Sequence, residues 1–123
     1  MQWLAVAMGG ALGAVGRYGI NALVYSLMGT RFPLGTLVVN VLGSLLMGVF
    51  YVLIVERQML PGPWREFIMI GLLGAFTTFS AFSLDILSLW EGGHVALALI
   101  YVLASVVLCV IAALAAIALT RLF

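Results

Sequence analysis

The sequence has very little charge and no lysine. Only 7% of its 123 residues are charged, whereas soluble domains carry roughly 25%. The five basic residues are all arginines, and the net charge is +1. Such a chain offers no basic surface for nucleic acid and no polybasic segment for lipid headgroups. Hydrophobic residues make up 66% of the chain, which is more apolar surface than a soluble fold of this size can bury.

Cysteine is almost absent as well. The single cysteine excludes an intrachain disulfide. Residues 1–16 contain no Lys or Arg, so the positive segment that opens a signal peptide is missing. We therefore expect the apolar start of the chain to be the first transmembrane helix.

The few charged residues separate four apolar blocks, and a helix needs about 20 residues to cross a bilayer. We expect a single four-helix transmembrane domain over residues 1–123, with spans at 3–28, 34–55, 65–89 and 94–120. The connections are short and leave no room for a soluble domain. The predicted fold class is an all-α membrane protein.

The third block has an unusual composition for a helix that only crosses lipid. Residues 71–83 combine two glycines, the pair Thr77-Thr78, two serines and three phenylalanines. Glycine weakens a helix, and hydroxyls compete with backbone hydrogen bonds. An unpaired backbone group costs several kcal/mol in hydrocarbon, so a break needs protein, water or an ion as partner. We predict that the third helix is broken in mid-membrane.

Two further blocks carry polar residues at helical spacing. Thr36, Asn40, Ser44 and Gly48 recur every four residues in the second block and share one helix face. The Asn40 amide either clamps two helices or lines a polar pathway, and spacing leaves both open.

Tyr101, Ser105 and Cys109 form a similar line in the fourth block. Isolated Ser and Cys usually bond to their own backbone, so this line is either structural or part of a pathway. His94, at the start of the same block, is expected to lie at the membrane interface.

Other residues have both a packing and a functional interpretation. Gly9 and Gly13 lie four apart, which favours close helix packing. Phe79 and Phe82 project from one side of a helix; they either pack in lipid or turn their positive ring edges toward an anion. Arg17 lies inside a span, where a charge must find a partner, snorkel to the interface or face a water-filled vestibule.

Four spans place both termini on one side of the membrane. Arg57, Arg65 and Arg121 would lie on that side and Arg31 on the other. This weak bias permits insertion in both orientations. Four small helices are also few to enclose a polar pathway, so we favour a homodimer, with an antiparallel one plausible.

Three motifs together resemble the small bacterial fluoride channels of the Fluc (CrcB) family. They are Gly9-Gly10 with Gly13-Ala14 and Arg17-Tyr18, the segment Gly35–Ser44 around Asn40, and the segment Gly71–Ser83. The resemblance implies an antiparallel, dual-topology homodimer with two pores in the inner (plasma) membrane. It also implies passive export of fluoride, hence fluoride resistance, and no enzymatic activity.

The resemblance assigns roles to single residues. Phe79 and Phe82 would form a box of ring edges around the ion path, Asn40 would contact fluoride or orient this box, and Arg17 would attract anions to a vestibule. The complete predicted pathway comprises Thr36, Asn40, Phe79, Ser80, Phe82, Tyr101, Ser105 and Cys109. A structural Na⁺ on the dimer axis would be held by the backbone carbonyls of Gly74 and Thr77 from both subunits. The chain departs from the family pattern at Ala81, often Thr, and at Cys109, usually Ser.

Two other classes of protein remain as alternatives. A small multidrug-type, proton-coupled cation exporter also has four spans, but it needs an acidic residue within the membrane. Here the first span carries Arg17, and Asp85 comes late in the third. A non-transporting membrane subunit would explain the glycines but not the aligned polar faces.

Overall fold

The computed structural model describes all residues 1–123 and is entirely helical, with no β-strand. Two segments are π-helices, which hold more residues per turn than an α-helix and are designated η. The elements in chain order are α1 (Gln2–Met28), α2 (Leu34–Phe50), η1 (Tyr51–Glu56), η2 (Arg65–Leu73), α3 (Gly74–Phe76), α4 (Phe79–Glu91) and α5 (Val95–Leu122).

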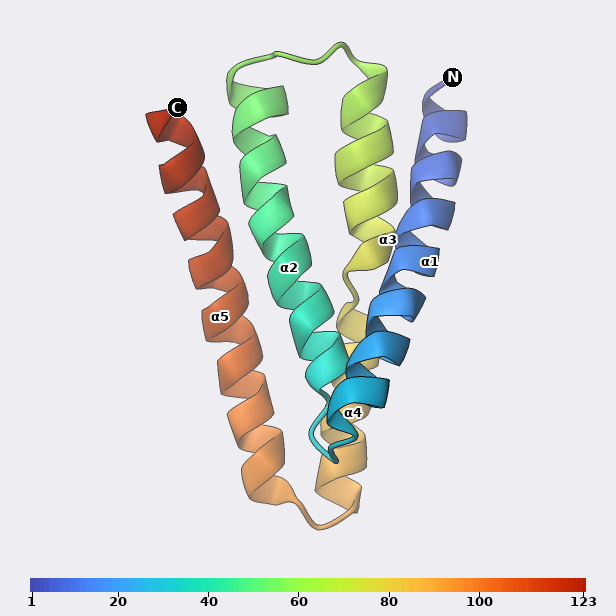
Figure 1. Ribbon diagram of the computed structural model, residues 1–123, viewed down its shortest axis with the longest axis vertical. Helices are drawn as coiled ribbons and strands as arrows, with labels where there is room; N and C mark the ends of the chain where they lie inside the picture. The colour runs from blue at the N-terminus through green and yellow to red at the C-terminus, as the bar shows by residue number, and fades with distance from the viewer.

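The helices form long rods that lie side by side, and both chain termini are at the same end (Figure 1). The connection from η1 to η2 lies at that end, and the α1–α2 and α4–α5 connections lie at the opposite one (Figure 1). Helix α1 ends where Gly29 adopts a left-handed conformation with φ of 50°. Its N–H bonds to the carbonyl of Tyr25 at 2.9 Å, which closes the last turn.

Three helical segments are long and apolar enough to cross a membrane by length and composition: Leu34–Glu56, Arg65–Glu91 and Val95–Leu122. The prediction of an all-α, multi-pass membrane protein is therefore confirmed. Helix α1 is 27 residues long but is not among the three, because Arg17 and Asn21 lower its hydropathy. That α1 makes a fourth span stays a prediction.

Glycines allow α1 to pack closely on the third helical segment. A Cβ atom at Gly9 would collide with the backbone carbonyl of Phe67, and one at Gly13 with that of Leu72. Both glycines are buried. The packing interpretation of Gly9 and Gly13 is therefore confirmed.

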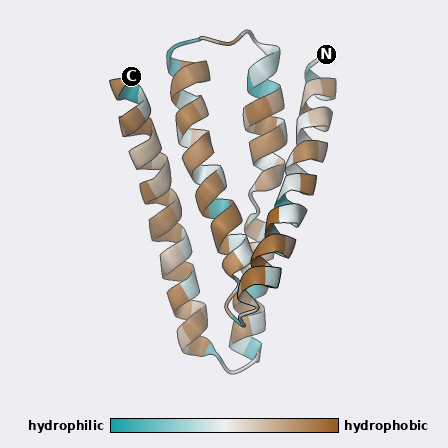
Figure 2. Cartoon of the chain, in the orientation of Figure 1, coloured by the Kyte–Doolittle hydropathy of each residue, from teal (hydrophilic) through white to brown (hydrophobic).

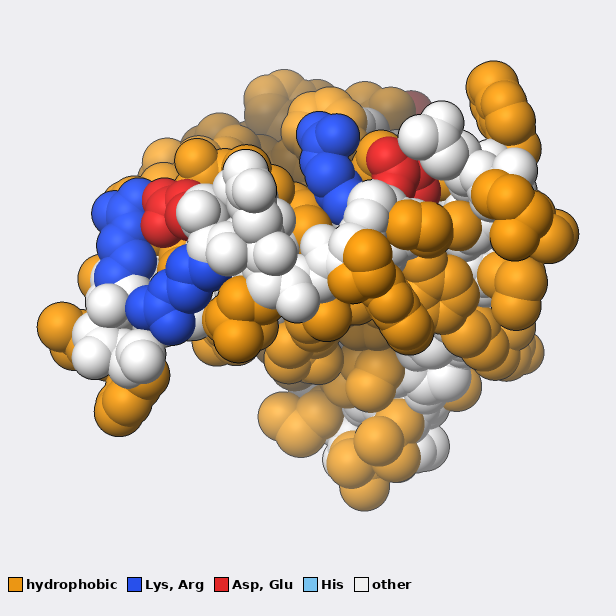
Figure 3. All heavy atoms as spheres, turned by 90° about the horizontal axis from the view of Figure 1, so that it is seen from above, with side chains coloured by type: hydrophobic (Ala, Val, Ile, Leu, Met, Phe, Trp, Pro, Cys, Tyr) orange, Lys and Arg blue, Asp and Glu red, His pale blue; other side chains and the backbone are white.

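Hydrophobic residues occupy most of the length of each helix, and hydrophilic ones lie mainly near the helix ends and at a few positions along α1 and α2 (Figure 2). A compact group of four buried residues, Phe82, Leu89, Ala98 and Tyr101, joins α4 to α5. Seen from the end that carries the termini, charged side chains lie on an apolar body (Figure 3). There Arg121 pairs with Glu56, which ties the end of α5 to the end of η1.

Candidate functional site

The helix is interrupted at Thr77 and Thr78, where the ribbon uncoils between α3 and α4 (Figure 1). Thr77 has φ −76° and ψ 156°, and Thr78 has φ −151° and ψ 119°, so both are extended. The Thr78 hydroxyl accepts a hydrogen bond from the N–H of Ala81 at 3.2 Å and caps α4. The Thr77 hydroxyl donates to the carbonyl of Leu73 at 2.9 Å. The adjacent threonines thus finish one helix and start the next.

Asn40 of α2 supplies the backbone partners that the interruption removes. Its Nδ2 donates to the carbonyl of Thr78 at 3.0 Å, and its Oδ1 accepts from the N–H of Thr78 at 2.8 Å. Thr78 is only 7% exposed, so both of its backbone groups need a partner within the protein. Asn40 therefore clamps α2 to the interruption, and its role in a pathway stays a prediction.

Two backbone carbonyls lose their helical partners at the same place. In a continuous helix the Thr78 N–H would bond to the Gly74 carbonyl, but here it bonds to Asn40. The Ala81 N–H bonds to the Thr78 hydroxyl and not to the Thr77 carbonyl. No hydrogen bond from turns or loops ends on either carbonyl. These oxygens are the kind of donor that a hard cation prefers, so the residues fit the Na⁺ that the family resemblance implies.

A groove of about 460 Å³ runs beside the interruption, between α2, α4 and α5. Its lining contains five of the predicted pathway residues: Asn40, Phe79, Phe82, Ser105 and Cys109. These residues come from three helices. The structure therefore brings together residues that are up to 69 positions apart in the sequence, from Asn40 to Cys109.

Ser105 has an unusual hydrogen-bonding state within this groove. The residue is 5% exposed, and its hydroxyl has no hydrogen-bond partner in the chain. Several other hydroxyls in the helices bond to their own backbone, as Ser83 does to Phe79 at 3.0 Å and Thr120 to Ala116 at 2.6 Å. A buried hydroxyl without a partner is costly, so this one is expected to meet a ligand or water in the groove.

Aromatic rings extend from the groove toward the α4–α5 connection. The centroids of Phe79 and Phe82 are 5.4 Å apart, and those of Phe82 and Tyr101 are 5.2 Å apart. Phe32 then meets Tyr101 edge-on at 5.4 Å. Phe82 is buried, whereas 78% of Phe79 is exposed on the single chain. The ring edges of this series are the positive parts that can face an anion.

Tyr101 does not line the groove. It is fully buried, and its hydroxyl donates to Oδ2 of Asp85 at 3.0 Å. The spacing grouped this hydroxyl with the Ser105 hydroxyl and the Cys109 thiol, and sequence reasoning missed both Asp85 and Phe32 as neighbours. Asp85 and Tyr101 are sixteen positions apart, with the α4–α5 turn between them, so no short-range pattern signals the contact.

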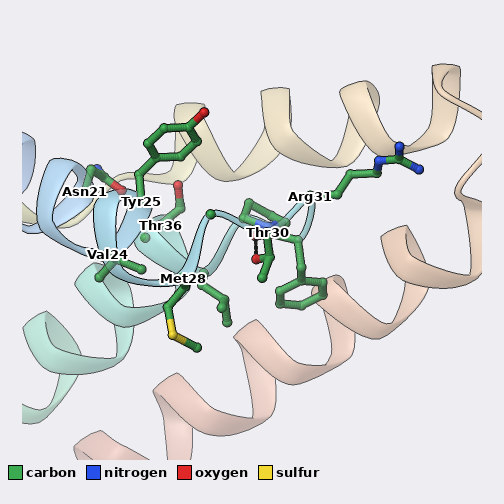
Figure 4. Close-up of a pocket in the computed structure, with 12 residues that line it drawn as sticks. Asn21, Val24, Tyr25, Met28, Thr30, Arg31 and Thr36 are labelled. Carbon is green, nitrogen blue, oxygen red and sulfur yellow. Dashed lines mark hydrogen bonds between the residues drawn. The ribbon is translucent and has the colours of Figure 1, made fainter.

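Three further predicted residues lie outside the groove. Thr36 is buried and lines a smaller cavity of about 260 Å³ at the α1–α2 connection. In that cavity Asn21 and Tyr25 lie on the same side as Thr36, while Arg31 extends away (Figure 4). Ser80 is exposed, with its hydroxyl 3.3 Å from that of Thr78. Arg17 is half-buried and lines neither cavity.

The chain was compared with known protein families. Residues 4–117 match the family model described as "CrcB-like protein, Camphor Resistance (CrcB)". The chain belongs to this family. The resemblance drawn from the three sequence motifs is thereby confirmed.

Individual members of the CrcB-like family are similar over almost the whole chain. The protein named "Fluoride-specific ion channel FluC" of Saccharophagus degradans is 58% identical over 97% of this chain and 89% of its own length. Proteins of the same name from Hahella chejuensis and Magnetococcus marinus are 52% and 50% identical, over 95% and 92% of this chain and 92% of their own lengths. The exporter alternative finds no support among these relatives.

Proposed function

We propose that this chain is a fluoride-selective channel through which fluoride leaves the cell passively, and that it thereby confers fluoride resistance. Family membership and the names of its relatives support this function. The observation within the chain that carries it is the buried hydroxyl of Ser105, a residue of the groove lining, which has no hydrogen-bond partner in the chain. A channel binds its ion and lets it pass without a chemical reaction, so no enzymatic step is assigned.

Fluoride holds its hydration water strongly, so a pathway must replace that water with several moderate donors. Ser105 supplies one free O–H. Asn40 uses one of its two amide hydrogens on Thr78 and retains the other. We assign both to the pathway, with the thiol of Cys109 as a weaker donor one turn further along α5.

We assign Phe79 and Phe82 to a pair of ring edges that contact the ion beside these donors. Their rings are tilted by 47° to each other, which leaves edges as well as faces available. Tyr101 packs against Phe82 and continues this route toward the α4–α5 end. Ser80, next to Phe79, and Thr36, in the smaller cavity, would contact fluoride on its approach. Arg17 would draw anions toward the pathway from a vestibule.

We infer that the working unit is an antiparallel homodimer in the inner membrane, with α1 as a fourth span and the third span broken at Thr77-Thr78. Exposure of 78% of Phe79 supports a second chain, because a ring that lines a pathway needs a wall on its other side. The small arginine asymmetry of the chain permits both orientations.

We also infer a structural Na⁺ where two such chains meet. The carbonyls of Gly74 and Thr77 would hold it, because both have lost their helical partners and Gly74 is exposed. The cation would supply positive charge that compensates four carbonyl dipoles. In this arrangement the backbone oxygens of one chain reach the other through the ion.

Fluoride efflux from liposomes that contain the purified protein tests the function. Efflux should follow the electrochemical gradient, exclude chloride and need no proton gradient. Phe82→Ile should abolish efflux while the protein still elutes at the size of the parent assembly. Full efflux in this variant would remove the ring edges from the mechanism, and proton-driven cation uptake by the parent would favour an exporter instead.

A further inference from the structure

Cys109 is the only thiol of the chain and lies in the groove. It is half-buried, one turn of α5 beyond Ser105. A cysteine in an apolar helix normally acts as a small hydrophobic residue. This one is different because it lines the groove beside Ser105, whose buried hydroxyl has no partner in the chain and therefore requires a water or an ion at this level.

We propose that Cys109 is a covalent modification site inside the groove, accessible to small, uncharged thiol-directed reagents through water. The reactive species is the thiolate, which forms in a hydrated environment and not against lipid. The site itself depends only on hydration of the groove. The further statement that modification blocks transport rests on the proposed function.

The reaction with methyl methanethiosulfonate is balanced without any other reagent. The Cys109 thiol loses its proton to water, and the thiolate attacks the sulfenyl sulfur of the reagent. A new S–S bond forms as the bond to the sulfonyl sulfur breaks, and methanesulfinate leaves. The product carries a methylthio group that narrows the groove of about 460 Å³ and removes the S–H donor.

The experiment treats the full-length protein in liposomes with this reagent, then measures intact mass and fluoride efflux. One control is Cys109→Ser, which has no thiol. A second adds Leu108→Cys to Cys109→Ser. Leu108 is the preceding residue of α5, exposed and outside the groove lining. A thiol introduced at this position therefore has nearly the same depth as that of Cys109 but faces another direction.

The parent protein should gain one methylthio group and lose about tenfold or more of its efflux, with recovery after reduction by dithiothreitol. Cys109→Ser should gain no mass and keep its own untreated rate. The Leu108→Cys thiol should react much more slowly than that of Cys109. Equal reaction at both positions, or no reaction at Cys109, would overturn the hydrated site.

The transport part of the proposal has its own outcome. Modification without loss of efflux would show that Cys109 lies off the conduction route. If the untreated parent carries no fluoride at all, the proposed function fails, while the mass comparison between Cys109 and Leu108→Cys still decides whether the site exists.

Discussion

Replacing Asn40 with leucine should destabilise the protein, because it removes both partners of a buried backbone residue. Leucine is close to asparagine in size but neither donates nor accepts hydrogen bonds. The change leaves the N–H and the carbonyl of Thr78 unpaired. Thr78 is 7% exposed and lies within a membrane-length segment, so water has little access to either group.

The expected loss follows from these two contacts. A buried group left without its partner costs about 1–3 kcal/mol, so two groups cost about 2–6 kcal/mol. Hydrogen bonds between membrane helices average only about 0.6 kcal/mol each, because the unfolded chain also finds partners. Two such bonds sum to about 1 kcal/mol, which sets the lower limit of the expected loss of stability. The free energy of unfolding should therefore fall by about 1–6 kcal/mol.

Unfolding in a denaturing detergent, followed by tryptophan fluorescence, measures this loss. The matched control is Ser44→Ala, one turn further along α2. Ser44 lines the same groove but has no hydrogen bond with Thr78, so its replacement should leave stability almost unchanged. If Asn40→Leu costs less than about 0.5 kcal/mol, or no more than Ser44→Ala, the clamp is not what supports the interruption.

Two other substitutions test separate parts of the structure. Ser105→Ala should lower fluoride efflux without loss of stability, since the Ser105 hydroxyl has no partner in the chain. The control Ser26→Ala should leave efflux unchanged, because the Ser26 hydroxyl bonds to Leu23 outside the groove. Unchanged efflux in Ser105→Ala would exclude the hydroxyl from the pathway. Gly9→Ala should lower the free energy of unfolding by about 1–3 kcal/mol, because the new Cβ meets the Phe67 carbonyl. Gly10→Ala, which has open space around its Cβ, should raise the free energy of unfolding by about 0.5–1 kcal/mol. An equal loss at Gly10 would indicate that a second chain packs on this face of α1.

Spacing along the helices predicted much of the groove. Asn40, Phe82 and Ser105 were each selected within their own helix, and the structure places all three on the same cavity. Their shared position has a simple cause, because residues three or four apart share a helix face and a polar face in an apolar helix turns inward. That they contact fluoride stays a prediction. Spacing did not identify the Thr78 backbone as the partner of Asn40, since the two are 38 residues apart.

Other features follow from tertiary contacts or local geometry that no pattern revealed. Tyr101 shares the spacing of Ser105, yet its longer side chain reaches past the groove to Asp85. The two π-helices were not predicted either. Extra residues per turn change which side chains share a face, so spacing arguments built on 3.6 residues fail within Arg65–Leu73.

The depth of Ser105 in the membrane distinguishes it from the other buried polar group without a partner. Glu66 is the second residue of η2, so its buried Oε2 lies near the end of its helix, close to the headgroup region. Ser105 lies ten residues into α5, which at 1.5 Å per residue is about 15 Å from the start of that helix. This is about half of a hydrocarbon core of roughly 30 Å. Lipid offers no hydrogen bond at this depth, so a partner for the Ser105 hydroxyl must arrive through the groove itself.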